Sequence, residues 1–194
     1  KTGGLADVAG ALPGALTKHG VAMRSLVPGY SKVMREITDV EPVYSFGSLF
    51  GGPATLLFAK AGALEIYVLA APHLYERDGG PYGDATGKDW PDNWMRFAAL
   101  SKVAAEVANG IVPNFVPDIV HAHDWQAALA PVYMKYGSAH ATPSVMTVHN
   151  LAFQGQFAAD IFPALGMPQQ AYSVDGLEYY GSVGFLKGGL QCSW

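Results

Sequence analysis

The 194-residue sequence is poor in cysteine and in charged residues, and it has no excess of basic ones. Its single cysteine, Cys192, excludes an internal disulfide and predicts a protein of a reducing compartment. Twelve basic residues stand against 16 acidic ones, so the net charge is -4 and no basic stripe is present. This argues against nucleic acid and anionic membranes as partners. No apolar run approaches the length that spans a bilayer.

Apolar residues are abundant instead. Half of the chain is hydrophobic and only 14% is charged, which is enough apolar material for a sizeable buried core. A length of 194 residues suits one domain or a large part of one. The chain begins directly at a loop with no strand leading into it, and it stops inside an apolar segment at 191–194. We therefore expect a fragment of a longer protein.

Short apolar stretches alternate with helical patterns. Strands are predicted at 21–27, 44–50, 54–58, 64–69, 118–122 and 144–148. Helices are predicted at 4–18, from 92 or 93 to 109, and at 126–136. Pro13 is expected to interrupt the hydrogen bonding of the first helix, and 44–50 with 54–58 forms a candidate antiparallel hairpin. The alternation predicts an α/β fold, a doubly wound parallel sheet covered on both faces.

The opening residues are typical of an anion site at the start of a helix. Gly3 and Gly4 let the backbone turn tightly and approach a ligand closely, and apolar residues at helical spacing follow them. The first amides of such a helix are unpaired and its dipole is positive there, so a phosphate is stabilised, with Lys1 as a charge beside it. The alternative is a plain loop before a helix.

Two polar clusters follow predicted strands at the point where each strand ends. His121-Ala122-His123-Asp124-Trp125 follows one strand, and His149-Asn150 follows the next. In open parallel sheets, ligands bind just past the carboxyl ends of the strands. Asp124, His149 and Asn150 are therefore predicted to face the same crevice as the opening glycine turn.

Each of these residues also has a purely structural interpretation. Asp124 is a candidate cap of the helix that starts near Trp125, and Trp125 is either a core residue or a stacking surface for a sugar ring. His149 is alternatively a hydrogen-bonded core imidazole, and His121 a strand-end histidine bonded to the backbone. The residue types alone leave these alternatives open.

A metal site is a further alternative, and the least favoured. His121 and His123 lie two residues apart on one strand face, where two imidazoles can ligate zinc. A catalytic zinc site needs further ligands, and His140 has no clear partner in its segment. No metal is therefore predicted; the function that such a site would imply is a metal-dependent hydrolase.

Several motifs together resemble the bacterial glycogen synthases and plant starch synthases. They are KTGGLADV at 1–8, PGY at 28–30, DN at 92–93 with RF at 96–97, PDIVHAHDW at 117–125, TVHN at 147–150, QG at 154–155 and FLKGGL at 185–190. The likeness covers essentially the whole chain in order. The opening loop and the His-Asp-Trp segment are each specific.

The resemblance implies a retaining glycosyltransferase with two Rossmann-like lobes facing a cleft, the GT-B fold. Residues 1–194 would form the N-terminal, acceptor-side lobe without its first strand, and the C-terminal nucleotide-binding lobe would lie outside this chain. The implied reaction transfers glucose from ADP-glucose to the non-reducing end of an α-1,4-glucan such as glycogen, without metal or other cofactor. The implied location is the bacterial cytoplasm.

The resemblance also assigns roles by position. Lys1, Gly3 and Gly4 would meet the donor diphosphate, His149 would bond the glucosyl group, and Asp124 would sit close to the reacting centre. The remaining substrate contacts that it implies are Asp7, Tyr82, Trp125 and Asn150. Lys187 is a weaker candidate, for which a helix-surface lysine is an equally good interpretation.

Two expectations about activity follow. No protein nucleophile is visible, so the acceptor is expected to attack on the face from which the diphosphate departs. The chain alone is expected to be inactive, because half of the cleft would be absent. The alternative function is a free-standing glucan-binding or regulatory module derived from the same lobe.

Overall fold

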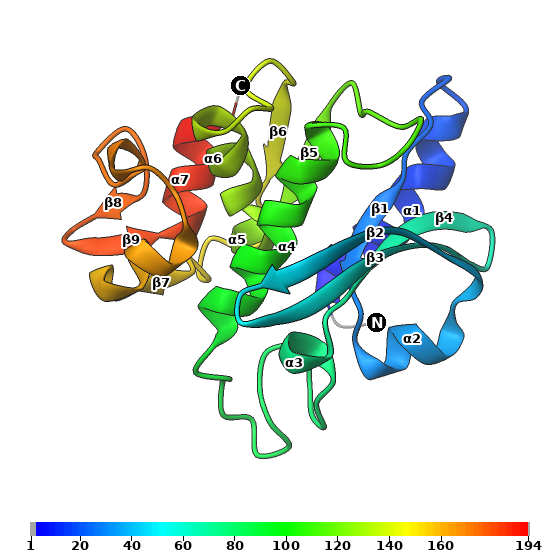
Figure 1. The fold of residues 1–194 in the computed structure, drawn as a ribbon, viewed down its shortest axis with the longest axis horizontal. Helices are drawn as coiled ribbons and strands as arrows, with labels where there is room; N and C mark the ends of the chain where they lie inside the picture. The colour runs from blue at the N-terminus through cyan, green and yellow to red at the C-terminus, as the bar shows by residue number, and fades with distance from the viewer. Residues whose placement is uncertain (1–2, 194) are drawn as a thin grey trace. The chain divides into compact units, whose positions relative to one another are not determined.

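A computed structural model of the chain describes residues 3–193 (Figure 1). The chain divides into two compact units, 1–91 and 92–194. Both contain helices and strands, so the α/β class predicted from the sequence is confirmed. No helix among residues 3–193 is long and apolar enough to cross a membrane.

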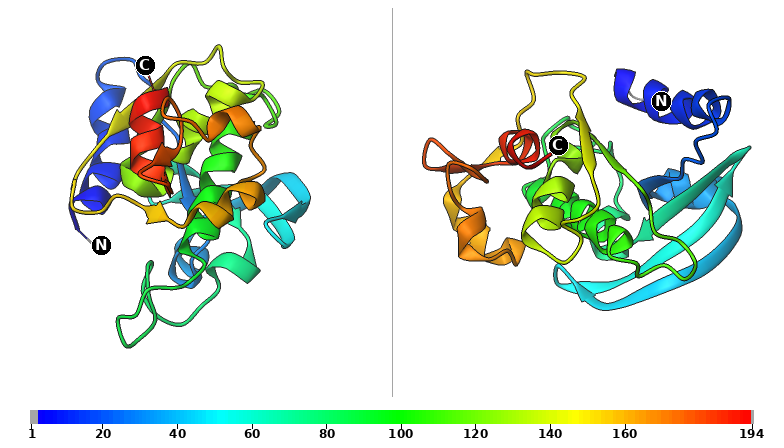
Figure 2. Two further views of the ribbon diagram at one scale, coloured as in Figure 1. Left: turned by 90° about the vertical axis from the view of Figure 1, so that its left-hand side faces the viewer. Right: turned by 90° about the horizontal axis from the view of Figure 1, so that it is seen from above.

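The first unit is built on a four-stranded mixed sheet. Its elements are α1 (Gly3–Thr17), β1 (Ser25–Pro28), α2 (Ser31–Glu36), β2 (Thr38–Leu49), β3 (Gly52–Ala61), β4 (Leu64–Ala70) and α3 (Pro72–Tyr75). The strand order is β1-β4-β3-β2. Strand β4 is parallel to β1 and antiparallel to β3, and β3 is antiparallel to β2. Figure 2 shows β2 and β3 running together as a long hairpin.

Burial explains the order of this sheet. Strand β4 lies inside it, and its run Ile66–Leu69 is buried, as expected of apolar residues covered on both faces. Ile66 and Val68 form a core cluster with Ala59, against which Val27 packs. Strand β2 is mostly exposed, pairs only with β3 among the described strands, and carries Pro42, which is tolerated in an edge strand.

The sheet departs from the all-parallel arrangement predicted from the alternation. The turns between β2 and β3 and between β3 and β4 are only two residues long, at 50–51 and 62–63. Parallel neighbours need a crossover of a dozen or more residues, so these strands can only pair antiparallel. The candidate hairpin is thereby confirmed. The helix α1 includes Pro13, which has no N–H to donate to the helix, and β1 begins four residues later than predicted.

The second unit packs helices around a short parallel strand pair. Its elements are α4 (Asn93–Ala108), β5 (Val120–His123), α5 (Asp124–Ala127), α6 (Leu129–Tyr136), β6 (Ser144–Thr147), β7 (Gln156–Phe157), the 3-10 helices η1 (Ala159–Leu165) and η2 (Gln169–Ala171), β8 (Glu178–Tyr179), β9 (Ser182–Gly184) and α7 (Phe185–Cys192). Strands β5 and β6 are parallel, whereas β7, β9 and β8 form a small antiparallel sheet. Helix α6 contacts α4 and α7 (Figures 1 and 2).

The helix predicted at 126–136 is split into α5 and α6. Pro131 has no N–H to bond the carbonyl of Ala127, and its ring clashes with that carbonyl. Helix α5 therefore ends at Ala127, and α6 begins at Leu129. The predicted start of α4 is confirmed, although Asp92 occupies the N-cap position without a side-chain capping bond. The small sheet and α7 have no counterpart among the predicted elements.

The contact between α7 and the preceding helices depends on a residue without a side chain. A Cβ atom at Gly189 would lie 2.6 Å from the carbonyl oxygen of Ala128, closer than real contacts allow, whereas one at Gly14 in α1 would meet nothing. We expect Gly189→Ala to lower the free energy of unfolding by about 1–3 kcal/mol. Gly14→Ala should instead raise it by about 0.5–1 kcal/mol, because alanine favours the helix. Urea denaturation of both variants tests this, and a Gly189→Ala protein as stable as the wild type contradicts the close approach.

Candidate active site

The parallel pair of β5 and β6 brings the two predicted polar clusters together. The register pairs His121 with Val145 and His123 with Thr147. Both strands therefore end at the same edge, and the chain beyond β6 reaches His149 two residues later. The prediction that the segments 121–125 and 149–150 meet at one sheet edge is confirmed.

Three imidazole rings stack at this edge. The ring centroids of His121 and His123 are 4.1 Å apart, and those of His123 and His149 are 5.3 Å apart with an interplanar angle of 15°. His123 Nδ1 lies 3.0 Å from His149 Nε2, within hydrogen-bonding distance. His121 Nε2 lies 2.7 Å from Thr147 Oγ1, so its partner is a side-chain hydroxyl rather than the backbone. The sequence analysis included Thr147 in the TVHN motif at 147–150 but did not predict it as a site residue.

Asp124 holds the backbone that carries His149. Its Oδ1 atom accepts a hydrogen bond from the His149 N–H at 2.6 Å and a longer one from the Asn150 N–H at 3.4 Å. The residue is buried and has a φ of 52°, in the left-handed region that aspartate tolerates better than most side chains. His123 occupies the N-cap position of α5, so the interpretation of Asp124 as a helix cap is wrong.

Burial also sets the charge of the stacked rings. Desolvation, helped by His121 and His149, lowers the pKa of His123 to about 4, and the nearby Asp124 opposes this shift. Burial, together with His149, also lowers the pKa of His121. Both rings are therefore neutral at pH 7. A neutral imidazole carries one donor and one acceptor nitrogen, so the direction of each of these hydrogen bonds depends on which ring nitrogen holds the proton.

The lowered pKa of His123 predicts a loss of stability in acid. Between pH 6.5 and 4 the unfolded chain binds a proton at His123 that the folded chain does not, so the free energy of unfolding falls as the pH falls through this window. In His123→Leu this contribution is absent, and the decrease should be smaller than in the wild type. Urea midpoints at pH 7 and pH 5 measure the difference. Equal decreases in both proteins contradict the prediction.

Trp125 packs as part of an aromatic cluster. Its ring centroid lies 4.9 Å from Phe97, 5.9 Å from Phe157 and 6.3 Å from Phe185. A Cβ atom at Gly155 would lie 2.6 Å from the Trp125 ring, and Gly155 has a φ of 60°. Gly155 thus covers the Trp125 ring. This close approach gives a structural reason for the glycine in the Gln154-Gly155 motif. These contacts favour the core interpretation, with the half-buried side chain retaining some exposed surface.

Asn150 forms its own turn after the strand exit. Its Oδ1 accepts a hydrogen bond from the Ala152 N–H at 2.9 Å, while the side chain as a whole is exposed. Its backbone N–H points at Asp124. Leu151 within this turn and Phe153 just after it both expose large apolar side chains. Asn150 therefore orders the loop that follows His149.

The remaining predicted site residues belong to the first unit. Lys1 lies outside the described residues, and Gly3 is the first residue of α1, so the predicted start of a helix at the glycine pair is confirmed. Gly4 and Asp7 are exposed in the first turns of this helix. Tyr82 is half-buried in the long loop after α3, where its carbonyl oxygen accepts a hydrogen bond from the Trp90 N–H. That these residues share a crevice with His149 stays a prediction.

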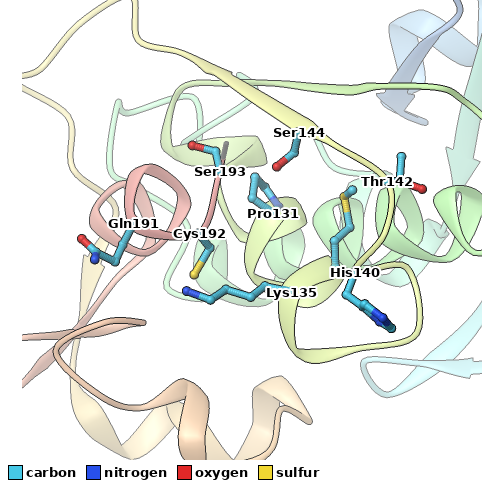
Figure 3. A pocket seen from close by; sticks show the side chains of 9 residues that line it. Pro131, Lys135, His140, Thr142, Ser144, Gln191, Cys192 and Ser193 are labelled. Carbon is cyan, nitrogen blue, oxygen red and sulfur yellow. The ribbon is translucent and has the colours of Figure 1, made fainter.

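A separate cavity of about 200 Å³ lies within the second unit (Figure 3). Its lining includes Lys135 and Cys192, whose amino group and thiol point toward one another, and the buried Ser144. Burial raises the pKa of the Cys192 thiol, against the opposing charges of Lys135 and Lys187. The thiol thus stays protonated at neutral pH, as expected of a buried cysteine that packs as a small apolar residue. None of the predicted site residues lines this cavity.

The imidazole stack does not have the geometry of a metal site. Among residues 3–193, no group of three histidine, cysteine or acidic side chains is arranged to hold a metal ion. His123 and His149 each use one ring nitrogen for the hydrogen bond between them. Lys187, the weaker candidate, donates hydrogen bonds to the backbone carbonyls of Val174 and Gly176, and so ties α7 to the segment before β8.

Comparison with known proteins decides the family. Residues 1–194 match the family described as "Starch synthase catalytic domain". The chain belongs to this family. The resemblance inferred from the motifs is thereby confirmed.

Individual members of the family are close in sequence. The chain is 61% identical over 193 residues to a glycogen synthase of Rhodopseudomonas palustris, and 61% identical over 192 residues to glycogen synthase 1 of Rhizobium meliloti. These alignments cover 100% and 98% of this chain but 40% of each relative. The chain therefore spans about two fifths of the length of the curated relatives that it matches.

A solved structure of the family has the same fold. The catalytic domain of starch synthase IV from Arabidopsis thaliana, bound to ADP and acarbose, matches all of this chain and 41% of its own with a TM-score of 0.81 at 25% identity. The expected likeness to a two-lobed glycosyltransferase fold is confirmed by this match.

Proposed function

We propose that this chain is the acceptor-side lobe of a glucosyltransferase. The longer protein transfers glucose from ADP-glucose to the 4-hydroxyl at the non-reducing end of an α-1,4-glucan and retains the anomeric configuration. The observation that carries this proposal is the match of all 194 residues to the starch synthase catalytic domain family. The meeting of the His-Asp-Trp and Thr-Val-His-Asn segments at one strand edge supports it.

The compounds bound to the solved relative agree with such a reaction. That starch synthase holds ADP, the leaving group of ADP-glucose, together with the saccharide acarbose. The similar bacterial relatives are glycogen synthases. We accordingly assign glycogen as the acceptor and the bacterial cytoplasm as the location, with no metal or other cofactor.

The residues at the strand edge have the chemistry to hold a reacting sugar. His149 offers a ring N–H or nitrogen at a position fixed from two sides, by His123 at its ring and by Asp124 at its backbone. Asp124 uses Oδ1 for two amides, and its Oδ2 has no hydrogen-bond partner among residues 3–193. We assign His149 to the glucosyl group and the free Asp124 oxygen to a sugar hydroxyl beside the reacting centre. Trp125, Asn150 and Tyr82 complete the contacts with the saccharide.

The opening of the chain is assigned to the diphosphate. Breaking the bond between glucose and a diphosphate leaves an anion and an oxocarbenium-like sugar. Backbone amides at Gly3 and Gly4, at the start of α1, together with Lys1, stabilise the anion by fixed positive charge. Asp7 supports this turn or contacts the sugar. No covalent glucosyl-enzyme forms, because the acceptor attacks on the face from which the diphosphate leaves.

The test uses the full-length protein from the same gene. Incubated with glycogen and ADP-glucose, it should release ADP and add α-1,4-linked glucose at non-reducing ends, with slower transfer from UDP-glucose. The 194-residue chain alone should give no transfer, because domain closure around the donor requires the second lobe. No glucosyl transfer from either nucleotide sugar by a folded full-length protein would overturn the proposal, as would trapping a glucosyl ester on Asp124.

A further inference from the structure

The hydrogen bond between His123 and His149 has a direction that the surroundings determine. The 3.0 Å separation of His123 Nδ1 and His149 Nε2 requires one ring to donate and the other to accept. His123 is neutral at pH 7, since burial lowers its pKa to about 4, so it carries a single ring proton. The question is which of its two nitrogens holds that proton.

The surroundings of His123 Nε2 determine which nitrogen holds the proton. His123 Nε2 is buried and has no hydrogen-bond partner in the described part of the chain. If His149 donated from Nε2, whether neutral or protonated, His123 would have to accept at Nδ1 and keep its proton on this buried Nε2. A buried N–H without an acceptor is rare in folded proteins, whereas an unfilled lone pair is more readily tolerated. The arrangement with the proton on His123 Nδ1 avoids the orphaned N–H.

We infer that His123 is a positioning residue that donates its Nδ1 proton to His149 Nε2 and so holds His149 as the neutral Nδ1–H tautomer. The Nε2 lone pair of His149 is then occupied, and Nδ1–H is the ring group left for a ligand. His149 thus acts as a hydrogen-bond donor to a sugar oxygen, and not as a base that removes a proton from the acceptor hydroxyl. This role rests on the proposed function, in which His149 contacts the glucosyl group.

Neighbouring contacts keep the donor in place. The ring of His121 lies against that of His123, with centroids 4.1 Å apart and planes tilted by 31°, and it is itself bonded to Thr147 on the adjacent strand. The stack therefore fixes the plane of the His123 ring, while Asp124 fixes the backbone of His149. Both ends of the His123–His149 hydrogen bond are thus restrained before substrate binds, as is usual for residues that orient a catalytic histidine.

The experiment measures the tautomer directly. In the full-length protein labelled with ¹⁵N-histidine, long-range ¹H–¹⁵N NMR distinguishes protonated from unprotonated ring nitrogens, and His149→Gln identifies the His149 signals. We expect Nδ1 of His149 to be protonated and Nε2 unprotonated at pH 7. A protonated Nε2 on His149 overturns the inference. Because this readout needs no turnover, it stands or falls separately from the proposed reaction.

Two substitutions at position 123 test the consequence. His123→Asn places an amide N–H close to where Nδ1 stood, so the His149 tautomer and most of kcat should persist. His123→Leu removes the donor, so His149 should move toward the Nε2–H form and kcat should fall about 10- to 100-fold, with a smaller change in KM for ADP-glucose. A His123→Leu enzyme with the wild-type tautomer or the wild-type kcat overturns the positioning role. Absence of transfer in the wild type overturns the proposed function instead.

Discussion

His149→Ala in the full-length protein should lower kcat for glucosyl transfer on the order of 100- to 1000-fold. The imidazole is held at its ring by His123 and at its backbone by Asp124, so in the proposed reaction it would meet the sugar without reorganisation. Loss of a donor that bonds the sugar more strongly in the transition state lowers kcat rather than raising KM. Initial rates at saturating glycogen, with ADP-glucose varied, measure the two constants separately.

The matched control is another histidine of the same unit. His140 is exposed, and its Nδ1 lies 3.4 Å from the carbonyl oxygen of Gly137, at the long limit of a hydrogen bond. His140→Ala should therefore leave kcat unchanged. Thermal unfolding of His149→Ala should show that the fold persists, since the lost side chain is only half-buried. If His149→Ala turned over at the wild-type rate, the assignment of this edge as the active site would be wrong.

Substitutions of Asp124 should separate its structural role from its chemical role. Asp124→Ala removes the acceptor of the His149 N–H and puts alanine, which tolerates the left-handed region less well than aspartate, at a φ of 52°, so two costs add. An unsatisfied buried donor costs about 1–3 kcal/mol, and a left-handed backbone about 1–2 kcal/mol. We expect the free energy of unfolding to fall by about 2–5 kcal/mol, with activity lost. Chemical denaturation of the full-length protein measures the stability.

Two further variants separate the cost of the lost hydrogen-bond acceptor from the cost of the left-handed backbone. Asp124→Gly relieves the backbone strain but still lacks the acceptor, so it should be more stable than Asp124→Ala. Asp124→Asn keeps an acceptor oxygen and tolerates the left-handed region, so it should fold nearly normally. It loses the negative charge that the proposed function places beside the reacting centre, and kcat should still fall at least about 100-fold. Equal stability of the alanine and asparagine variants would contradict the role of Oδ1 in holding the His149 backbone.

Local patterns were sufficient for the elements whose signals lie within the element itself. Alternating apolar strands and an amphipathic helix after Asp92 predicted β4, β5, β6 and α4 to within a few residues. The turn at 50–51 lies in the antiparallel hairpin that the sequence predicted, whereas the general rule for alternating strands and helices predicted parallel neighbours where the short turn at 62–63 imposes an antiparallel pair. The small strands β7, β8 and β9 lack a periodic signal because each has only two or three residues.

By itself the sequence determined the family, the α/β class and the residues gathered at the ends of β5 and β6. Those features depend on residue identity and order, which a motif records completely. Only the tertiary structure decided that His123 partners His149, that Asp124 holds the His149 backbone and does not cap a helix, and that Trp125 packs on Gly155. These contacts join residues about 25–30 positions apart. They depend on strand register, on a left-handed backbone at one aspartate and on burial, none of which a local pattern of residues encodes.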